Sequence, residues 1–199
     1  MNSWQRQPFS SLISTGGASA TFVSALSATH NNAINAGYGG SQAFDNDDGS
    51  SYYDTYDNFF YSSDGFKMDY GGHDSRSHGN VIVVREYDGQ VCYNAGDFNP
   101  GHETQIFDNL CVVPMGSDGT PNEMVGHTGS ACDGGAHGSG ALEAWNNSYF
   151  TPLAAATVGC SRGVTNLSDV KPPFELGSSS NLMPTPEQIV AWGRAKLLL

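Results

Sequence analysis

The chain has 199 residues, enough for one domain with a substantial core, and it is acidic, with a net charge of −12 and only 8 Lys plus Arg residues. This balance excludes a nucleic-acid-binding protein and a protein that docks on anionic membranes, because both need a basic surface. No apolar run reaches the roughly 18 residues of a membrane span. Charged residues are only 14% of the chain and Gly numbers 25, which suits many turns between short strands.

The first segment, residues 1–28, is predicted to be an entry segment. Its apolar residues within 4–26 are expected to fold over the first repeat, because an uncovered sheet edge is an aggregation hazard. The alternative is that they continue the sheet, in which case the chain is a piece of a longer protein. The start lacks the basic and apolar regions of a signal peptide, so we expect Met1 to follow missing upstream coils.

A recurring Asn marks the repeats that occupy residues 29–160. Each Asn has an aromatic or imidazole ring two positions before it and a core-type residue two positions after it. This alternation predicts short strands, and stacked Asn side chains can hydrogen-bond along a ladder. The rings, including His30 and His78, are expected to stack in the core. The ladder positions are Asn32, Asn58, Asn80, Asn109 and Asn147.

A second pattern repeats with the same spacing. Phe44-Asp45-Asn46-Asp47 and Phe66-Lys67-Met68-Asp69 are 22 residues apart, as are Asn58 and Asn80. A shared offset indicates a solenoid of stacked coils. The predicted coils cover residues 29–51, 52–74, 75–104 and 105–142, with a last coil from about Leu142 to Cys160. The fourth includes a long excursion over residues 115–140.

The C-terminal part, residues 161–199, is predicted to be an irregular strap followed by a helix. Thr185 is the expected N-cap, Pro186 occupies the first helical position and Gln188 the third. Arg194 and Lys196 suit the negative end of the helix dipole. The whole chain, residues 1–199, is thus expected to form a single all-β domain with a short C-terminal α-helix.

The repeats resemble those of right-handed parallel β-helix proteins of the pectate-lyase-like superfold. The resemblance rests on Asp47-Asp48-Gly49-Ser50-Ser51, Asp57-Asn58-Phe59-Phe60 and Gly65-Phe66-Lys67. It covers about residues 30–160, together with a C-terminal Pro-x-Pro-Glu-x-Ile-Val-x-Trp tail. It implies an extracellular protein that acts on a polysaccharide, as a glycoside hydrolase or a polysaccharide lyase. The superfold also hosts purely structural proteins, so the resemblance is more specific for fold than for activity.

The candidate site lies on the strands that share the 22-residue offset. The offset places Asp45 beside Lys67 and Asp47 beside Asp69, all projecting outward, since neighbours in a parallel sheet are about 4.8 Å apart. His73 is predicted at a corner near these carboxylates, and an imidazole exchanges protons near neutral pH. The candidate catalytic residues are therefore Asp45, Asp47, Lys67, Asp69 and His73.

Three interpretations of this cluster stay open. In a hydrolase, Asp47 with Asp69 or Asp45 acts as an acid–base or nucleophile pair. In a lyase, Lys67 or Arg76 abstracts a proton beside a uronate carboxyl that calcium neutralises, with Asp45, Asp47 and Asp69 as the calcium ligands. In a structural or carbohydrate-binding module, Asp45–Lys67 is an exposed ion pair worth under about 1 kcal/mol. The arginine motif of pectate lyases is absent.

The four cysteines suggest disulfides in an extracellular chain, and four cysteines allow three pairings. We favour Cys92–Cys111, which can lie one coil apart, together with Cys132–Cys160. A reduced, buried Cys111 is the alternative. The expected partner is a polysaccharide, with no nucleic acid and no membrane, and the expected location is extracellular.

Overall fold

The computed structural model describes most of the repeats and the C-terminal part of the chain. The entry segment before Ser27 lies outside the described residues, and so does its predicted covering role. The described residues are 27–30, 32–34, 44–46, 48–62, 65–68, 71–84, 91–95, 101–115, 125–126, 132, 142–160 and 163–199.

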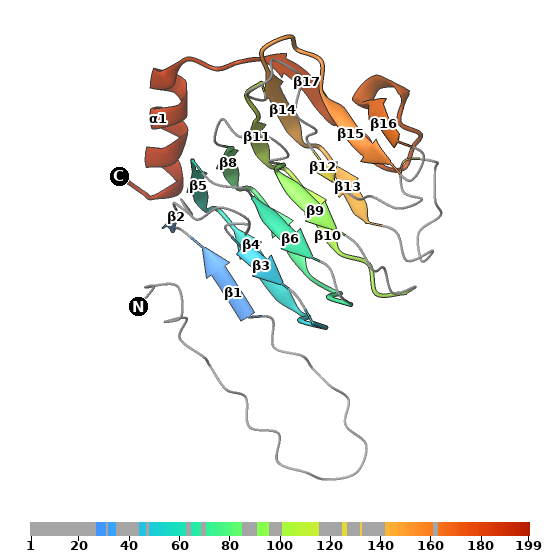
Figure 1. Cartoon of the computed structure of the whole chain (residues 1–199). Coiled ribbons are helices and arrows are strands. Elements are labelled where there is room, and N and C mark those ends of the chain that lie inside the picture. Colours follow the sequence, from blue (N-terminus) through green and yellow to red (C-terminus); the bar gives the residue numbers. More distant parts are fainter. Residues whose placement is uncertain are drawn as a thin grey trace, which may run out of the picture.

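Three stacked sheets hold the strands, and the chain visits the sheets in turn (Figure 1). One passage through the three sheets is called a coil. Sheet A consists, in order, of β1 (Ser27–His30), β4 (Tyr53–Tyr56), β7 (Arg76–His78), β10 (Gln105–Phe107) and β13 (Glu143–Trp145). Sheet B consists of β2 (Ala33–Ile34), β5 (Phe59–Tyr61), β8 (Val81–Val83), β11 (Leu110–Val112), β14 (Ser148–Thr151) and β17 (Ser179–Leu182).

Sheet C completes each coil. It consists of β3 (Phe44–Asn46), β6 (Phe66–Met68), β9 (Tyr93–Ala95), β12 (Val125–Gly126), β15 (Thr157–Cys160) and β16 (Gly163–Asn166). Phe44 pairs with Phe66 and Asp45 with Lys67, as the 22-residue offset predicts. In the described part of the chain all strand pairs are parallel except β15–β16. The protein is therefore mostly β, with stacked parallel sheets that are compatible with the predicted solenoid.

The predicted Asn ladder joins the coils. In each step, the backbone amide and the side-chain amide of one Asn donate to the side-chain oxygen of the next. The backbone bonds measure 2.9 Å from Asn58 to Asn80, 3.0 Å from Asn80 to Asn109 and 3.1 Å from Asn109 to Asn147. The stacking is confirmed, including the last step of 38 residues.

A left-handed residue precedes each of the four described ladder positions after Asn32. These residues are Asp57, Gly79, Asp108 and Asn146, with φ between 52° and 62°. The bend interrupts the alternation of strand side chains, so the ring before it faces outward while the Asn and the residue two positions later face inward. The prediction that His30 and His78 stack in the core is therefore wrong in its burial. Their rings do stack in a column, but His30 is exposed and His78 only half-buried.

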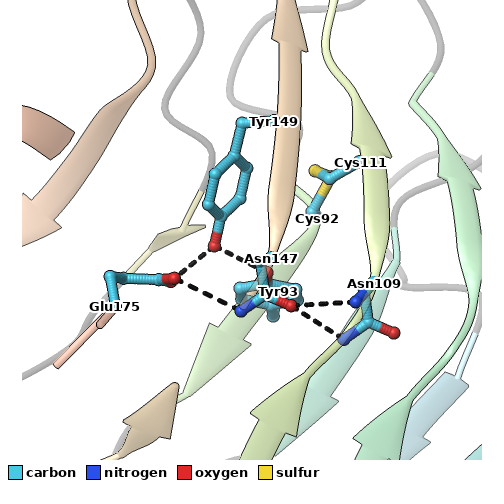
Figure 2. Close-up of a disulfide and its surroundings, with 7 residues drawn as sticks. All are labelled: Cys92, Tyr93, Asn109, Cys111, Asn147, Tyr149 and Glu175. Carbon is cyan, nitrogen blue, oxygen red and sulfur yellow. Dashed lines mark hydrogen bonds between the residues drawn. A yellow bond between two sulfur atoms is a disulfide. The ribbon is translucent and has the colours of Figure 1, made fainter. Parts of the chain in front are cut away.

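The core contains the side chains that follow the ladder, and two disulfides tie it. Phe60, Ile82, Cys111 and Tyr149 are each fully buried. Cys92 bonds to Cys111, with the two Cα atoms 6.1 Å apart, so this disulfide joins the start of β9 in sheet C to β11 in sheet B (Figure 2). The second disulfide is Cys132–Cys160, with the Cα atoms 5.8 Å apart. The predicted pairing is confirmed, and disulfides are typical of an oxidising, extracellular-type environment.

The segment predicted as an irregular strap contains two strands that extend the sheets. Strand β16 pairs antiparallel with β15, and β17 pairs parallel with β14. A 3-10 helix, η3 (Leu167–Asp169), lies between them. The helix α1 (Pro186–Lys196) begins at the predicted N-cap, Thr185, with a capping box to Gln188. Among the described residues, no helix has the length and apolar character to cross a membrane.

Helix α1 packs beside β5 and β8, as Figure 1 shows at the end of the chain. Gly193 is buried there against the ring of Phe59, and the ring of Trp192 lies 5.2 Å from that of Phe150. Lys196 Nζ contacts the carboxylate of Asp57 at 2.6 Å. A small residue and two rings thus hold the helix over sheet B.

The last ladder residue meets a buried carboxylate. Asn147 Nδ2 donates to Glu175 Oε2 at 3.3 Å, and Tyr149 Oη donates to Glu175 Oε1 at 2.5 Å (Figure 2). Ser178 also donates to Glu175, and Tyr93 Oη lies 2.6 Å from Tyr149 Oη. Burial raises the pKa of the Glu175 carboxyl, although these hydrogen bonds oppose the shift. Burial likewise raises the pKa of both tyrosines, and the negative charge of Glu175 adds to it.

Candidate functional site

The outer face of sheet A carries a row of polar side chains that crosses four successive strands. The register pairs Asp54 with Arg76, Arg76 with Gln105, and Gln105 with Glu143. Arg76 Nη2 lies 3.3 Å from Asp54 Oδ2, and Gln105 Nε2 donates to Glu143 Oε2 at 3.0 Å. The side chains are half-buried, and the buried residues next to them in each strand are Thr55, Ser77, Ile106 and Ala144. Because these neighbours point inward, the polar row faces out.

A row of stacked rings runs beside the polar row on the same face. Neighbouring ring centroids are 4.5–5.3 Å apart and the ring planes lie within 4–13° of parallel. Since the faces stack on one another, the outer edges of the rings form an apolar strip along the stack of coils. The row consists of His30, Tyr56, His78, Phe107 and Trp145.

The two rows meet at His78. Its Nε2 lies 2.9 Å from Asp54 Oδ1, while the other oxygen of the same carboxylate contacts Arg76. The imidazole is held between the rings of Tyr56 and Phe107. An imidazole oriented by a carboxylate can act as a general acid or base if a substrate reaches it.

A second group of ionisable side chains lies at the corner that precedes sheet A. Asp74 Oδ2 contacts two imidazoles, His73 Nδ1 at 2.8 Å and His102 Nδ1 at 2.7 Å. The ring centroids of the two histidines are 5.1 Å apart. Burial alone would raise the pKa of Asp74, but the hydrogen bonds and charges of His102 and His73 together lower it. This group, called the corner cluster, contains the ligand types that bind transition metals.

The backbone explains why these three side chains converge. His73 is the parallel bridge partner of Ser51, and the amide of Asp74 donates to the carbonyl of His102 at 3.3 Å. The corners of successive coils are thus stacked like the strands. Gly72 permits this approach, because a Cβ there would collide with the sulfur of Met68.

The structure places the predicted site residues in two different regions. Asp45 and Lys67 are register partners on the outside of sheet C, with Lys67 Nζ 3.3 Å from Asp45 Oδ1. Asp47 and Asp69 lie outside the described residues, so the carboxylate pair and the calcium site that depend on them stay predictions. The structure groups His73 with Asp74 and His102 in the corner cluster.

Sequence reasoning missed Asp54 and His102, although a signal for both was present. The steps of 22 and 29 residues between Asn58, Asn80 and Asn109 also separate Ser51, His73 and His102. The same steps lead from Asp54 to Arg76 and on to Gln105. Applying the offsets of the ladder to every polar residue, rather than to one strand pair, would have indicated both groups. Arg76 and His78, which were expected at coil corners, lie on β7.

Comparisons of this chain with protein-family models, with curated proteins and with solved structures found no match.

Proposed function

We propose that this chain is an extracellular right-handed parallel β-helix protein, of the pectate-lyase-like polysaccharide-active type, that binds a polysaccharide and cleaves it. The observation that carries the proposal is the outer face of sheet A. There, a polar row and a row of ring edges run side by side across successive coils. A linear glycan fits such a surface because its repeating units can meet equivalent positions in successive coils.

The chemistry of the face suits a sugar. The polar row offers carboxylate, guanidinium and amide groups that can hydrogen-bond sugar hydroxyls, and the ring edges offer an apolar contact for C–H groups. The net charge of −12 repels polyanions, so it favours a neutral or weakly charged polysaccharide as the ligand. The two disulfides support an extracellular location.

For cleavage, we propose that His78 exchanges the proton while Asp54 holds the imidazole in place. The two row carboxylates, Asp54 and Glu143, are three strand spacings apart, about 14 Å at about 4.8 Å per spacing, and two catalytic carboxyls of a glycosidase lie within about 10 Å. They are therefore not proposed as an acid–base pair. The candidate pair of Asp47 with Asp45 or Asp69 stays the alternative source of hydrolysis.

The second candidate function is a binding or structural module without catalysis. The ion pair between Asp45 and Lys67 favours it, since two opposite charges in register stabilise neighbouring strands without any substrate. The faces of the rings on sheet A also contact one another, as in a structural ladder.

The test is an activity and binding screen over neutral and uronate polysaccharides, with and without calcium. New reducing ends alone indicate a hydrolase, and the ultraviolet absorbance of unsaturated uronates indicates a lyase. If His78 transfers the proton, Asp54→Asn should lower the rate by about 100-fold or more while binding persists. Asp169→Asn, which changes an exposed carboxylate in η3, is the matched control and should leave the rate unchanged. Binding without turnover would support the module, and neither binding nor turnover on any polysaccharide would refute the proposal.

A further inference from the structure

The corner cluster presents three potential metal ligands to one point of the surface. One nitrogen of each imidazole and one oxygen of the carboxylate all lie within 4.8 Å of one another. Both Nδ1 atoms approach the same oxygen, at 2.8 Å from His73 and 2.7 Å from His102. Two ligands that each bind zinc at about 2.0–2.1 Å in a tetrahedral site are about 3.3 Å apart. Accepting an ion would therefore spread these atoms by only about half an ångström.

We propose that His73, Asp74 and His102 bind one transition-metal dication, with Zn²⁺ as the ion that fits the ligand set best. Two imidazoles and one carboxylate are typical ligands of zinc and of other first-row metals, and three protein ligands leave a coordination position for water or for an oxygen of a bound molecule. Calcium and magnesium take oxygen ligands, so this site differs from the calcium site predicted on Asp45, Asp47 and Asp69.

The ligands are positioned by the fold and do not depend on long mobile side chains. His73 and His102 occupy equivalent positions of successive coils, and the backbone hydrogen bond from Asp74 to His102 fixes their spacing. His73 is held further by its bridge to Ser51 and by an edge contact with the ring of Tyr52. Such preorganisation reduces the ordering that an ion must impose.

The cluster is also open to an ion from solvent. The side chains of His73, Asp74 and His102 are 21%, 27% and 46% exposed. Asp74 has a left-handed backbone, with φ of 51°, and residues held in this conformation occur often where side chains clamp a ligand. The site is independent of whether sheet A binds a polysaccharide.

The competing explanation is that Asp74 only orients two imidazoles. Both contacts are then ordinary hydrogen bonds, with each Nδ1 donating its proton to the carboxylate. This explanation predicts no metal affinity beyond that of any exposed histidine, whereas the proposal predicts one site that needs both imidazoles and the carboxylate.

The test is titration of the metal-free full chain with Zn²⁺, followed by calorimetry and by competition with a chromogenic chelator. We expect one ion per chain, and no displacement of it by an excess of Ca²⁺. His73→Ala and His102→Ala should each weaken binding by at least about tenfold, since even ligand-supporting residues contribute about 10–100-fold. His30→Ala removes another exposed histidine, from the ring row, and should leave the affinity within about twofold of the wild type.

A spectroscopic arm separates a defined site from loose binding. Co²⁺ bound by two imidazoles and a carboxylate should give visible absorption bands that Asp74→Asn weakens or shifts, and His30→Ala should preserve them. Melting curves of the metal-free variants keep loss of folding apart from loss of ligands. The proposal is overturned if Zn²⁺ does not bind, if the variants of the cluster bind as well as the wild type, or if His30→Ala loses as much affinity as they do.

Discussion

The side-chain oxygen of Asn80 accepts two hydrogen bonds from Asn58, one from its backbone amide at 2.9 Å and one from its side-chain amide at 3.1 Å. The same relationship repeats from Asn80 to Asn109 and from Asn109 to Asn147. Each Asn therefore satisfies buried polar groups of the preceding coil and has its own satisfied by the next. The bend of every coil depends on its neighbour for its hydrogen bonds.

Asn80→Ala should lower the free energy of unfolding by at least about 3 kcal/mol, because it leaves the buried backbone amide of Asn58 without its acceptor and removes three donor contacts of Asn80 itself. Urea unfolding measures the loss. Asn32→Ala is the control, since Asn32 is exposed at the start of the described ladder, and it should cost under about 1 kcal/mol. Equal losses in the two variants would show that the ladder does not couple the coils.

Glu175→Gln should change how stability depends on pH. Burial raises the pKa of Glu175 from 4.5, so the folded protein keeps this proton to a higher pH than the unfolded chain does. The stability contributed by the protonated group is complete below pH 4.5 and is lost as the pH rises through the raised value. Gln does not titrate, so over this window the variant should lose less stability than the wild type. Unfolding curves from about pH 4.5 to pH 8 test this, and parallel pH profiles would contradict it.

Glu175→Ala is the companion change. It removes the acceptor of Tyr149, Ser178 and Asn147 within the core, and a buried polar group without a partner costs about 1–3 kcal/mol. We expect a loss of at least about 2 kcal/mol near pH 7, where Glu175→Gln should be neutral or stabilising. If both variants lost the same stability, the shape of the side chain rather than its hydrogen bonds would be what matters.

Gly193→Ala should destabilise the protein even though Ala favours helices. A Cβ at Gly193 would lie 2.9–3.1 Å from three carbons of the Phe59 ring, and the ring cannot retreat without loosening α1 from sheet B. Helix propensity alone would stabilise the variant by about 1 kcal/mol. The control is Ala195→Gly on an exposed position of α1, which should cost about 1 kcal/mol by propensity. Thermal unfolding measures both, and a more stable Gly193→Ala would show that α1 moves freely.

Much of the fold could be predicted because the repeat is written into single residue types. Asn32, Asn58 and Asn80 need neighbours of the same kind to satisfy a buried bend, so their spacing in the sequence reports the stacking. The cysteines were paired correctly for a related reason: Cys92 and Cys111 belong to neighbouring positions of the core.

The facing of the rings could not be read in the same way. Alternation predicts that Tyr56, Asn58 and Phe60 share a face, but the left-handed backbone of Asp57 interrupts the alternation between the first two. Asp, unlike Gly, does not announce such a conformation in the sequence. The corner cluster was missed because His102 lies in a coil with a 29-residue step, whereas the search for chemistry used only the offset of 22.

The central claim is that the outer face of sheet A binds a polysaccharide, and affinity electrophoresis through gels that contain a polysaccharide tests it most directly. The account predicts that a neutral polysaccharide retards the wild type and that Arg76→Ala and Gln105→Ala raise Kd about tenfold, which corresponds to about 1.4 kcal/mol each. Tyr61→Ala, which removes an exposed ring from sheet B, should be retarded like the wild type. Equal retardation of all four proteins, or of none on any polysaccharide, would contradict it.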